Sequence, residues 1–349
     1  MSGVCTFVSF RLGGTDGVSV VAAAWAACLA EAGWTIRTVA GAGPVDHLVP
    51  GLAIGATEPP TDTELDEALA DADVVVAENI LSIPMQLPAS RVLARVLAGR
   101  PAVLHHHDPP WQRARFAHVT ELPPDDPAWH HVTINQLTEA EFRARGLAAT
   151  TIYNGFDTTV APGDRAATRE LLGLAPHTTL VAHPVRAIAR KGIPTAIDLA
   201  AALDAVYWLP GPAEEGYGTE LDRLIDASPV RVIRTAPAEL GAGQTMPDLY
   251  AAADLVAFPS TWEGFGNPPF EAAIHSRPVA VGRYPVATEL RRLGFWWLDP
   301  TDHAAVAAAV TAPNADALAR NRAIVEEHLS LDRMATRVNA LFEQAGLHP

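Results

Sequence analysis

The sequence predicts an α/β protein made of parallel sheets with helices on both faces, and three observations support this fold class. Short strand-like stretches alternate along the chain with helical patterns. The clearest strands are continuous apolar runs, which are typical of parallel strands buried on both faces. A chain of 349 residues is long for one domain and suits two domains of roughly 150 to 180 residues each.

Composition excludes several classes of protein. A hydrophobic content of 49% with 19% charged residues argues against disorder, and no apolar run approaches the ~20 residues of a membrane span. The formal charge of −15 argues against a nucleic-acid or anionic-lipid surface. Cys5 and Cys28 lie in apolar segments and are expected to be small core residues. Nothing resembles a secretion signal, so a cytoplasmic protein is predicted, and the abundance of Ala, Arg and Pro suggests a GC-rich bacterial genome.

The first predicted segment consists of a strand over Val4–Phe10, a glycine-containing turn over Leu12–Gly17 and a long helix that follows. The glycine spacing differs from the dinucleotide-binding fingerprint. The turn is either purely structural, or Gly13 and Gly14 bring main-chain amides against a ligand, with Arg11 or Asp16 beside it.

Polar residues follow two of the next predicted strands. Glu78 and Asn79 end one of them, where a polar ligand can be bound, although Asn79 can equally cap a turn. Three histidines, His105 to His107, end another and are followed by Asp108 and Trp111. Adjacent strand residues point to opposite faces, so all three histidines cannot ligate one ion, and no metal site is predicted. The strands predicted in this half are Trp34–Val39, Asp73–Ala77, Pro101–Leu104, His131–Asn135 and Thr151–Tyr153.

A turn signal over residues 154–157 and a polar stretch over Asp157–Asp164 predict a linker, which places the domain boundary between residues 156 and 157. Beyond a helix at Arg165–Leu172 and a strand at Thr179–Pro184 come the three cations Arg186, Arg190 and Lys191. They form either a solvated basic loop or an anion clamp. Further strands are predicted at Val206–Leu209, Val230–Ile233, Pro278–Val281 and Trp296–Leu298, with helices at Gly218–Ala227 and Met246–Ala252 and from about His303, Asn314 and Leu331.

The most informative stretch is Leu255–Pro278. An apolar strand over Leu255–Phe258 leads into a loop, and Pro268 after Asn267 predicts a helix that begins with an N-cap. Glu263 lies in the loop and Glu271 in the first turns of the helix. Gly264 and Gly266 would let a ligand approach the backbone closely. This is either an ordinary α/β connection or a ligand-binding loop.

Residues 263–271, with Phe258-Pro259-Ser260 before them and Ala272 after them, resemble the motif of two glutamates with seven residues between them in the retaining family 4 glycosyltransferases of GT-B fold. Four weaker motifs resemble that family in the same order: Gly13-Gly14, His107-Asp108, Asn154-Gly155-Phe156-Asp157, and Arg186 with Lys191-Gly192. The resemblance implies two Rossmann-like, doubly wound parallel-sheet domains that face a central cleft. Residues 1–156 would take the acceptor, residues 157–330 the nucleotide-sugar donor, and the helix in 331–349 would cross back to the first domain.

The resemblance also implies the reaction: transfer of a hexose from a UDP- or GDP-linked donor to a hydroxyl of a small-molecule, glycan or lipid-linked acceptor. The anomeric configuration would be retained by front-face displacement, with no metal or cofactor. The implied catalytic residues are His107, Glu263, Arg186 and Lys191, and His106 would face away. The implied donor contacts are Gly13, Gly14, Arg186, Lys191, Arg234, Gly264, Phe265, Gly266, Asn267 and Glu271. The implied acceptor contacts are Glu78, Asn79, Asp108 and Trp111, while Arg190 would be exposed.

Three alternatives remain. A glycoside hydrolase also uses two carboxylates, but it needs no diphosphate clamp and is therefore less favoured. A GT-B nucleotide-sugar epimerase and a non-catalytic nucleotide-sugar-binding protein would share the donor residues. The residues do not separate uracil from guanine or adenine, and they do not predict the acceptor, the linkage or the oligomeric state.

Overall fold

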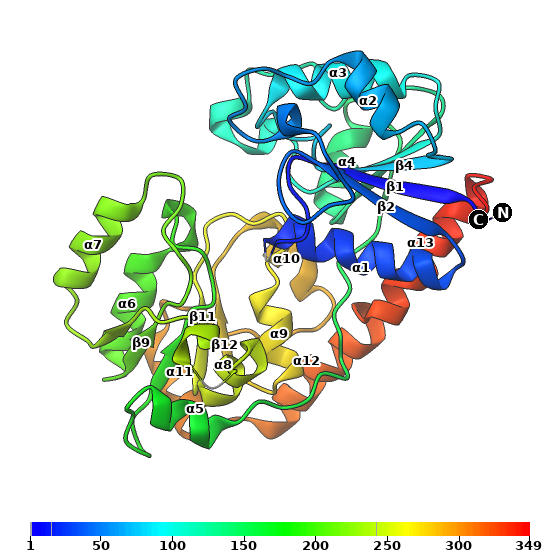
Figure 1. Ribbon diagram of the computed structural model, residues 1–349. Coiled ribbons are helices and arrows are strands. Elements are labelled where there is room, and N and C mark those ends of the chain that lie inside the picture. Colours follow the sequence, from blue (N-terminus) through cyan, green and yellow to red (C-terminus); the bar gives the residue numbers. More distant parts are fainter. Residues whose placement is uncertain (1, 15, 242) are drawn as a thin grey trace. The chain divides into compact units, whose positions relative to one another are not determined.

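The computed structural model describes residues 2–14, 16–241 and 243–349, which form two compact units (Figure 1). Unit 1 contains the chain up to Gly155 together with Leu331–Pro349. Unit 2 contains Phe156–Ser330. The chain therefore leaves unit 1 once and returns to it with its last helix.

Within the described residues, unit 1 has a seven-stranded parallel sheet in the order β3-β2-β1-β4-β5-β6-β7. The chain runs from β1 outward to β3, returns to β4 beside β1, and then runs outward to the other edge. The strand order thus reverses between β1 and β4. The strands are β1 (Val4–Ser9), β2 (Thr35–Ala40), β3 (His47–Leu48), β4 (Val74–Glu78), β5 (Ala102–His106), β6 (Trp129–Thr133) and β7 (Ala149–Thr151).

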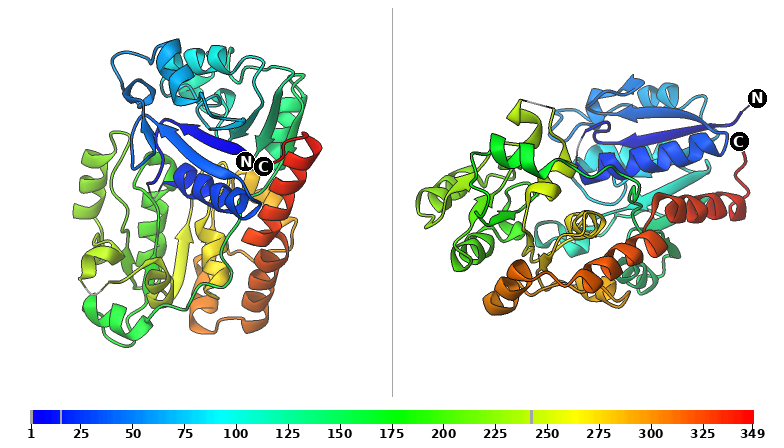
Figure 2. Two further views of the ribbon diagram at one scale, coloured as in Figure 1. Left: turned by 45° about the vertical axis from the view of Figure 1, so that its right-hand side comes forward. Right: turned by 90° about the horizontal axis from the view of Figure 1, so that it is seen from below.

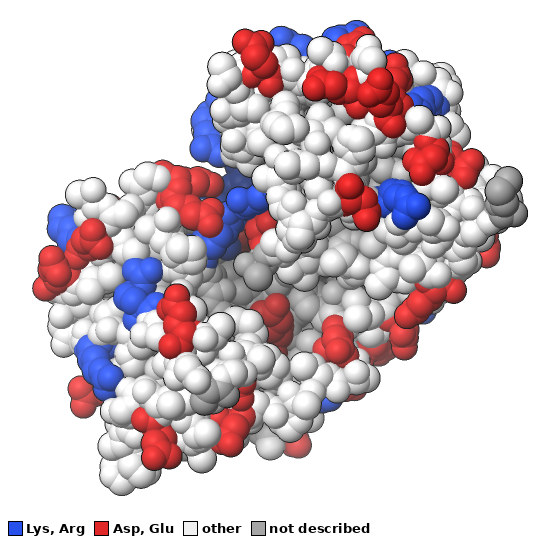
Figure 3. Space-filling view, in the orientation of Figure 1, with Lys and Arg blue, Asp and Glu red and all other residues white. Residues whose placement is uncertain are grey.

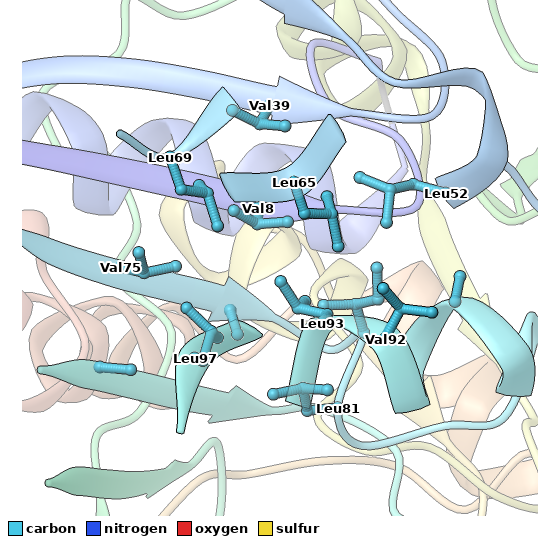
Figure 4. Packing of buried hydrophobic residues seen from close by; sticks show 14 of the residues in the cluster. Val8, Val39, Leu52, Leu65, Leu69, Val75, Leu81, Val92, Leu93 and Leu97 are labelled. Atoms are coloured by element: carbon cyan, nitrogen blue, oxygen red, sulfur yellow. The ribbon is translucent and has the colours of Figure 1, made fainter. Parts of the chain in front are cut away.

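Both faces of the unit 1 sheet are covered, as the continuous apolar runs predict. Val8 of β1 points into a core with Leu65 and Leu93 of the helices α2 and α3 (Figure 4). Its neighbour Phe7 points into a second core with Trp25 of α1 and other residues of α1 and α13. The helices of this unit are α1 (Gly17–Glu31), α2 (Asp62–Ala68), α3 (Leu87–Leu97), α4 (Gln136–Arg143) and α13 (Leu331–Gln344), with short 3-10 turns at 50–52, 110–112 and 114–116.

The last helix, α13, belongs to unit 1 because its apolar face packs against α1. Val338 and Phe342 lie in the same buried cluster as Trp25 and Leu29. Figure 2 shows α13 beside α1 in both views, with the two ends of the chain close together. A Cβ placed on Gly3 would lie 3.2 Å from the carbonyl oxygen of His348, so the chain ends are in contact within unit 1.

Unit 2 contains a five-stranded parallel sheet, counted over its described residues, in the order β10-β9-β8-β11-β12. Here the strand order reverses between β8 and β11. The strands are β8 (Leu180–Ala182), β9 (Val206–Trp208), β10 (Val232–Ile233), β11 (Leu255–Phe258) and β12 (Val279–Val281). The helices are α5 (Arg165–Leu171), α6 (Ile193–Ala202), α7 (Gly218–Asp226), α8 (Met246–Ala252), α9 (Pro268–Ile274), α10 (Pro285–Arg291), α11 (His303–Thr311) and α12 (Ala315–His328), with 3-10 turns at 189–191 and 237–240.

The predicted strand over Trp296–Leu298 is wrong. Only Leu298 makes an isolated parallel bridge, to Ala280. The backbone N–H of Trp296 instead donates to the side-chain oxygen of Asn321 at 2.7 Å, and the side-chain amide of Asn321 donates back to the carbonyl of Trp296 at 2.8 Å. A side chain of α12 therefore satisfies the groups that a strand would have paired.

The surface agrees with the negative charge of the chain. Figure 3 shows Asp and Glu side chains gathered over α2 of unit 1, where Asp62, Glu64, Asp66 and Glu67 are all exposed. No helix in the described parts of the chain is both long and apolar enough to cross a membrane.

Candidate active site

In unit 2, the predicted donor residues gather where the strand order reverses. The loop after β8 carries Arg186, Arg190 and Lys191, and the loop after β11 carries Glu263. In doubly wound sheets, ligands bind beyond the carboxyl ends of the strands at such a reversal. Gly192 brings the two loops together: its φ is +68°, and a Cβ there would lie 2.4 Å from the carbonyl oxygen of Pro259. A larger residue would force these loops apart.

The centre of this arrangement is a buried carboxylate held by two cations. Glu263 accepts from the Lys191 ammonium at 2.6 Å through Oε1 and from the Arg190 guanidinium at 2.6 Å through Oε2. The side chains of Glu263 and Lys191 are only 7% and 11% exposed. Burial alone would raise the pKa of Glu263, but Lys191 and Arg190 outweigh it and lower that pKa to about 2. The carboxylate is therefore ionised and fixes both cations.

Two predictions about the basic loop can be compared with this geometry. Arg190, expected to be exposed, is instead a partner of Glu263, and it also donates to the carbonyl of Trp262 at 2.8 Å. That expectation is wrong because the turn at 189–191 directs both Arg190 and Lys191 toward β11. Arg186 does not join the pair: it lies 2.6 Å from Glu214, and both side chains are about one-third exposed.

The glycine-rich loop after β11 has one position that only glycine fits. Gly266 has a φ of +91°, and a Cβ there would lie 2.8 Å from both the Phe258 ring and the Tyr284 hydroxyl. Phe265 is buried and packs against the ring of Phe270, with centroids 5.0 Å apart. Packing thus fixes the backbone of this loop, with Gly264 between Glu263 and Phe265.

Helix α9 begins at Pro268, as predicted, but Asn267 is not a side-chain cap. Its backbone is already helical, and its side chain makes no capping bond; its carbonyl accepts from the amides of Phe270 at 2.9 Å and Glu271 at 3.2 Å. The capping prediction was therefore wrong, because an N-cap side chain needs an extended backbone to reach the first turn.

The second glutamate, Glu271, has different surroundings from Glu263. It accepts a hydrogen bond from the hydroxyl of the buried Tyr250, and burial raises its pKa above the usual range. The two carboxylates therefore contact different groups and have opposite pKa shifts.

Arg234, predicted near the nucleotide base, donates to the carbonyls of Leu209 at 2.8 Å and Gly211 at 2.7 Å, which fixes the loop after β9.

In unit 1, predicted site residues meet at the carboxyl ends of β4 and β5, next to the reversal between β1 and β4. Glu78, at the end of β4, is fully buried; its Oε1 lies 3.0 Å from Nδ1 of His105 and its Oε2 lies 3.1 Å from Nε2 of His107. Burial would raise the pKa of Glu78, but the two histidines lower it to about 2. Since an ionised carboxylate only accepts, both of these ring nitrogens carry hydrogen. The hydrogen bond from Nε2 of His107 to Glu78 thus fixes the orientation of the His107 ring.

The neighbouring residues build the turn that presents His107. Asn79 has a φ of 59°, and its side-chain oxygen accepts from the amides of His107 at 3.0 Å and Asp108 at 3.1 Å. His106 points away, as expected, and bonds to His131 at 2.9 Å. Glu78 and Asn79, predicted as acceptor contacts, therefore use their oxygens to position His107 and its backbone.

The described residues contain one group with the spacing of metal ligands: Glu78, His105 and His107, whose donor atoms lie within 4.8 Å of one another. Because side chains alternate along β5, His105 and His107 point to the same side. The alternation excludes one ion bound by all three histidines, but it does not exclude one bound by these two. The separations of 3.0 and 3.1 Å are those of hydrogen bonds, and they are shorter than the roughly 3.3 Å between ligands of a tetrahedral zinc site with bonds of about 2.0–2.1 Å.

The remaining predicted residues of unit 1 lie in its loops. Gly13 has a φ of +75°, and a Cβ there would lie 2.6 Å from the Pro44 ring, so this turn packs tightly. Gly14 follows it in the same loop after β1. Asp108 is paired with Arg113, and the Trp111 indole donates to Glu141 at 2.7 Å.

Sequence reasoning missed three residues of these clusters: His105, Tyr250 and His183. His105 lies on the same side of the sheet as His107, because side chains two residues apart along a strand point the same way. This spacing could have identified His105 from the sequence. Tyr250 lies one strand and one loop before Glu271, and no pattern pairs them. His183, at the end of β8, is fully buried, bonds to the Tyr207 hydroxyl at 2.8 Å, and has its pKa lowered to about 3 by burial and by nearby Lys191.

Comparison with known proteins adds the following. Residues 187–316 match the family model of glycosyl transferases group 1. The mannosylglucosylglycerate synthase of Thermotoga maritima is 29% identical over 258 residues, which cover 64% of this chain and 60% of that protein. A D-inositol 3-phosphate glycosyltransferase of a Mycobacterium species is 38% identical over 151 residues, which cover 39% of this chain and 33% of that protein. The chain thus spans only part of the length of these relatives.

Solved structures resemble almost the whole chain. Anabaena HepE in complex with UDP-glucose has a TM-score of 0.73 at 22% identity, with 97% of this chain and 99% of that one covered. WaaG, a glycosyltransferase involved in lipopolysaccharide biosynthesis, has a TM-score of 0.68 at 14% identity, with 97% and 99% covered. At these identities, the likeness shows a common fold.

The ionised Glu263 predicts a pH dependence of stability. Its pKa is depressed in the folded state, so its contribution to stability is present above its ordinary pKa near 4.5 and is lost as the pH falls toward about 2. Replacing Glu263 by Gln leaves Lys191 and Arg190 facing a neutral group, which we expect to cost about 3–5 kcal/mol at pH 7. Urea unfolding at several pH values should show the difference from the wild type shrinking between pH 4.5 and 2. A difference that stayed constant over this range would contradict the ion pairing.

Proposed function

We propose that this chain, whose residues 187–316 match the model of the group 1 glycosyltransferases, is a glycosyltransferase of GT-B fold that transfers a hexose from a nucleotide-diphosphate sugar to an acceptor hydroxyl with retention of configuration. Unit 2 would bind the donor and unit 1 the acceptor. The observation that carries the proposal is the buried Lys191–Glu263–Arg190 cluster at the strand reversal of unit 2. The family model covers Lys191, Glu263 and Glu271.

The cluster supplies what the departing diphosphate needs. An ammonium carries three donors, and Glu263 uses one of them on Lys191. The remaining N–H donors of Lys191 can bind a phosphate oxygen. Because Glu263 already fixes the position of the ammonium, little reorganisation is required when charge develops on the leaving diphosphate. Among the described residues, Arg186 forms an ion pair only with the partly exposed Glu214, and we propose that a diphosphate displaces that contact and binds Arg186 as well.

The two glutamates then have separate roles. Glu263, ionised and surrounded by cations, would position Lys191 and accept from hydroxyls of the transferred sugar. Glu271, whose hydrogen bond with Tyr250 orients its carboxylate, would accept from the ribose hydroxyls. Gly264 and Gly266 let the loop approach the sugar and the phosphates, next to Phe265 and Asn267. A hydrolase needs no cations for a diphosphate, so Lys191 and Arg190 beside Glu263 favour a transferase over an acid/base pair of carboxylates.

The proposed step is a front-face displacement. The bond between the anomeric carbon and the diphosphate oxygen breaks, the acceptor oxygen attacks from the same face, and the acceptor proton passes to a phosphate oxygen of the leaving group. The nucleoside diphosphate leaves with that proton, and the cations neutralise its charge. Neither a metal ion nor a protein nucleophile takes part in the proposed step.

On the acceptor side, we propose that His107 contacts the reacting sugar or acceptor hydroxyl. Its Nε2–H is engaged with the buried Glu78, which fixes the ring and leaves Nδ1 for a contact with the ligand. Gly13 and Gly14 follow β1, the strand that pairs with β4. Asp108 and Trp111 are proposed acceptor contacts, although each already has a partner within unit 1.

The choice of donor rests on support from relatives. A similar structure holds UDP-glucose, which favours a uridine nucleotide and glucose, while one relative is a mannosylglucosylglycerate synthase, which keeps GDP-linked mannose as a candidate. A small polar acceptor suits the names of both reported relatives, the mannosylglucosylglycerate synthase and the D-inositol 3-phosphate glycosyltransferase.

An epimerase or a non-catalytic binding protein would release no glycoside, so incubation with a donor panel and detection of a glycosidic product separates these functions.

Lys191 provides the kinetic test of the clamp. We expect Lys191→Ala to lower kcat by about 10²-fold or more, because the ammonium acts where charge develops on the leaving group. Arg283→Ala is the matched control, since Arg283 is 86% exposed in a surface pair with Asp299 and should leave kcat unchanged. Steady-state assay of nucleoside diphosphate release measures both. Full kcat in Lys191→Ala would show that the clamp is assigned wrongly.

Metal independence has its own test. We expect the transfer rate with excess chelator to equal the rate without it, because Lys191 and Arg186 would neutralise the diphosphate. Loss of activity that Mg²⁺ restores would overturn this part of the proposal.

A further inference from the structure

Unit 2 has a second basic pocket, away from the residues assigned to the donor. It has a volume of about 330 Å³ and lies among the start of α5, the C-terminal end of α9 and α12. Arg165, Arg277 and Arg322 line it together with His275, and its lining residues include no Asp or Glu. In a chain of net charge −15, three guanidinium groups around one pocket require an explanation.

Two of these arginines also have structural roles, which fix them in place. Arg165 donates to the carbonyls of Ala251, Ala252 and Ala253 at 2.8–3.1 Å, at the C-terminal end of α8, and pairs with Asp254 at 2.5 Å. Arg322 donates to the carbonyl of Ile274 at 2.7 Å and to that of Thr158 at 3.1 Å, and it pairs with Glu326. Arg165 thus caps the C-terminal end of α8 and Arg322 that of α9, which gives both residues a structural role.

Arg277 has no such role. Its Nε is buried with no hydrogen-bond partner, and no ion pair to it occurs within the part of the chain that the structure describes. Burial and nearby Arg165 lower the pKa of Arg277, and the charge of Asp254, which forms no ion pair with it, offsets only part of this shift. The neighbouring carboxylate of Asp254 already binds Arg165, Arg169 and the amide of Leu180. A half-buried cation without an ion pair is costly, unless a ligand supplies the missing charge.

We propose that this pocket binds the phosphate group of a small phosphomonoester. Guanidinium groups match phosphate oxygens bidentately, and Arg277 lines the pocket with a guanidinium that no ion pair within the described residues engages. Arg165 and Arg322 are already held in position, so binding orders few additional side chains. The volume of about 330 Å³ leaves room for an organic group beside the phosphate.

The pocket is separate from the proposed donor site. It lies at the C-terminal end of α9, whereas Glu263 and the glycine-rich loop precede the N-terminal end of that helix. Seven helical residues span about 10 Å at 1.5 Å per residue. The inference therefore goes beyond the proposed transfer reaction and does not depend on it.

Calorimetric titration of the full chain tests the proposal, with inorganic phosphate, glycerol 3-phosphate and glucose 6-phosphate as probes. We expect saturable binding of a phosphomonoester at one site per chain, weakened at least tenfold in Arg277→Gln. The control Arg283→Gln, at an exposed arginine of the same unit, should bind as the wild type does. Lys191→Ala should also bind the ester normally, because that variant alters only the donor clamp.

Three results would overturn the proposal: no saturable ester binding, equal binding by wild type and Arg277→Gln, or binding abolished by Lys191→Ala, which would place the ester in the donor site. An ester that bound no better than inorganic phosphate would overturn the claim that the pocket accepts an organic group. Removal of an unpaired cation should leave the melting temperature of ligand-free Arg277→Gln unchanged or higher. If that variant failed to fold, Arg277→Lys would serve, and it should bind more weakly because it cannot form the bidentate contact.

Discussion

The ion cluster of Glu263 with Lys191 and Arg190 is the interaction on which unit 2 depends. It lies where the sheet reverses its strand order, and it joins the loop after β8 to the loop after β11. Buried ion pairs contribute little net stability, because desolvation offsets their attraction. Their value here is positional: a carboxylate that remains ionised holds two cations where an incoming diphosphate would meet them.

Unit 1 has a buried carboxylate at the corresponding place, with different partners. Glu78 ends β4, one of the two strands between which the order reverses, and accepts from ring nitrogens of His105 and His107 at the end of the neighbouring β5. The cations around Glu263 suit an anionic ligand, whereas the histidines around Glu78 leave a ring nitrogen of His107 for a hydroxyl. The same constraint, that a buried carboxylate needs donors, thus gives each unit a different chemistry.

The sequence predicts much of the fold, because continuous apolar runs and proline or glycine boundaries are local signals; β11 at Leu255–Phe258 and α8 at Met246–Ala252 agree with their predicted bounds. It also predicts the residues that meet at the strand ends, since parallel strands bring these ends together. It does not predict the partners of Arg190 or the Tyr250–Glu271 bond, which depend on side-chain direction and on contacts distant in sequence. The absent strand at Trp296 has the same cause: Asn321, 25 residues later, satisfies its backbone.

The central claim is that Lys191 binds the donor's diphosphate while Glu271 binds its ribose, and calorimetric titration with UDP and UMP, or with GDP and GMP if guanine is preferred, tests it most directly. The wild type should bind the diphosphate at least tenfold more tightly than the monophosphate. Lys191→Ala should lose that preference, whereas Glu271→Ala should weaken both nucleotides equally and keep it. An undiminished preference for the diphosphate in Lys191→Ala would contradict the account.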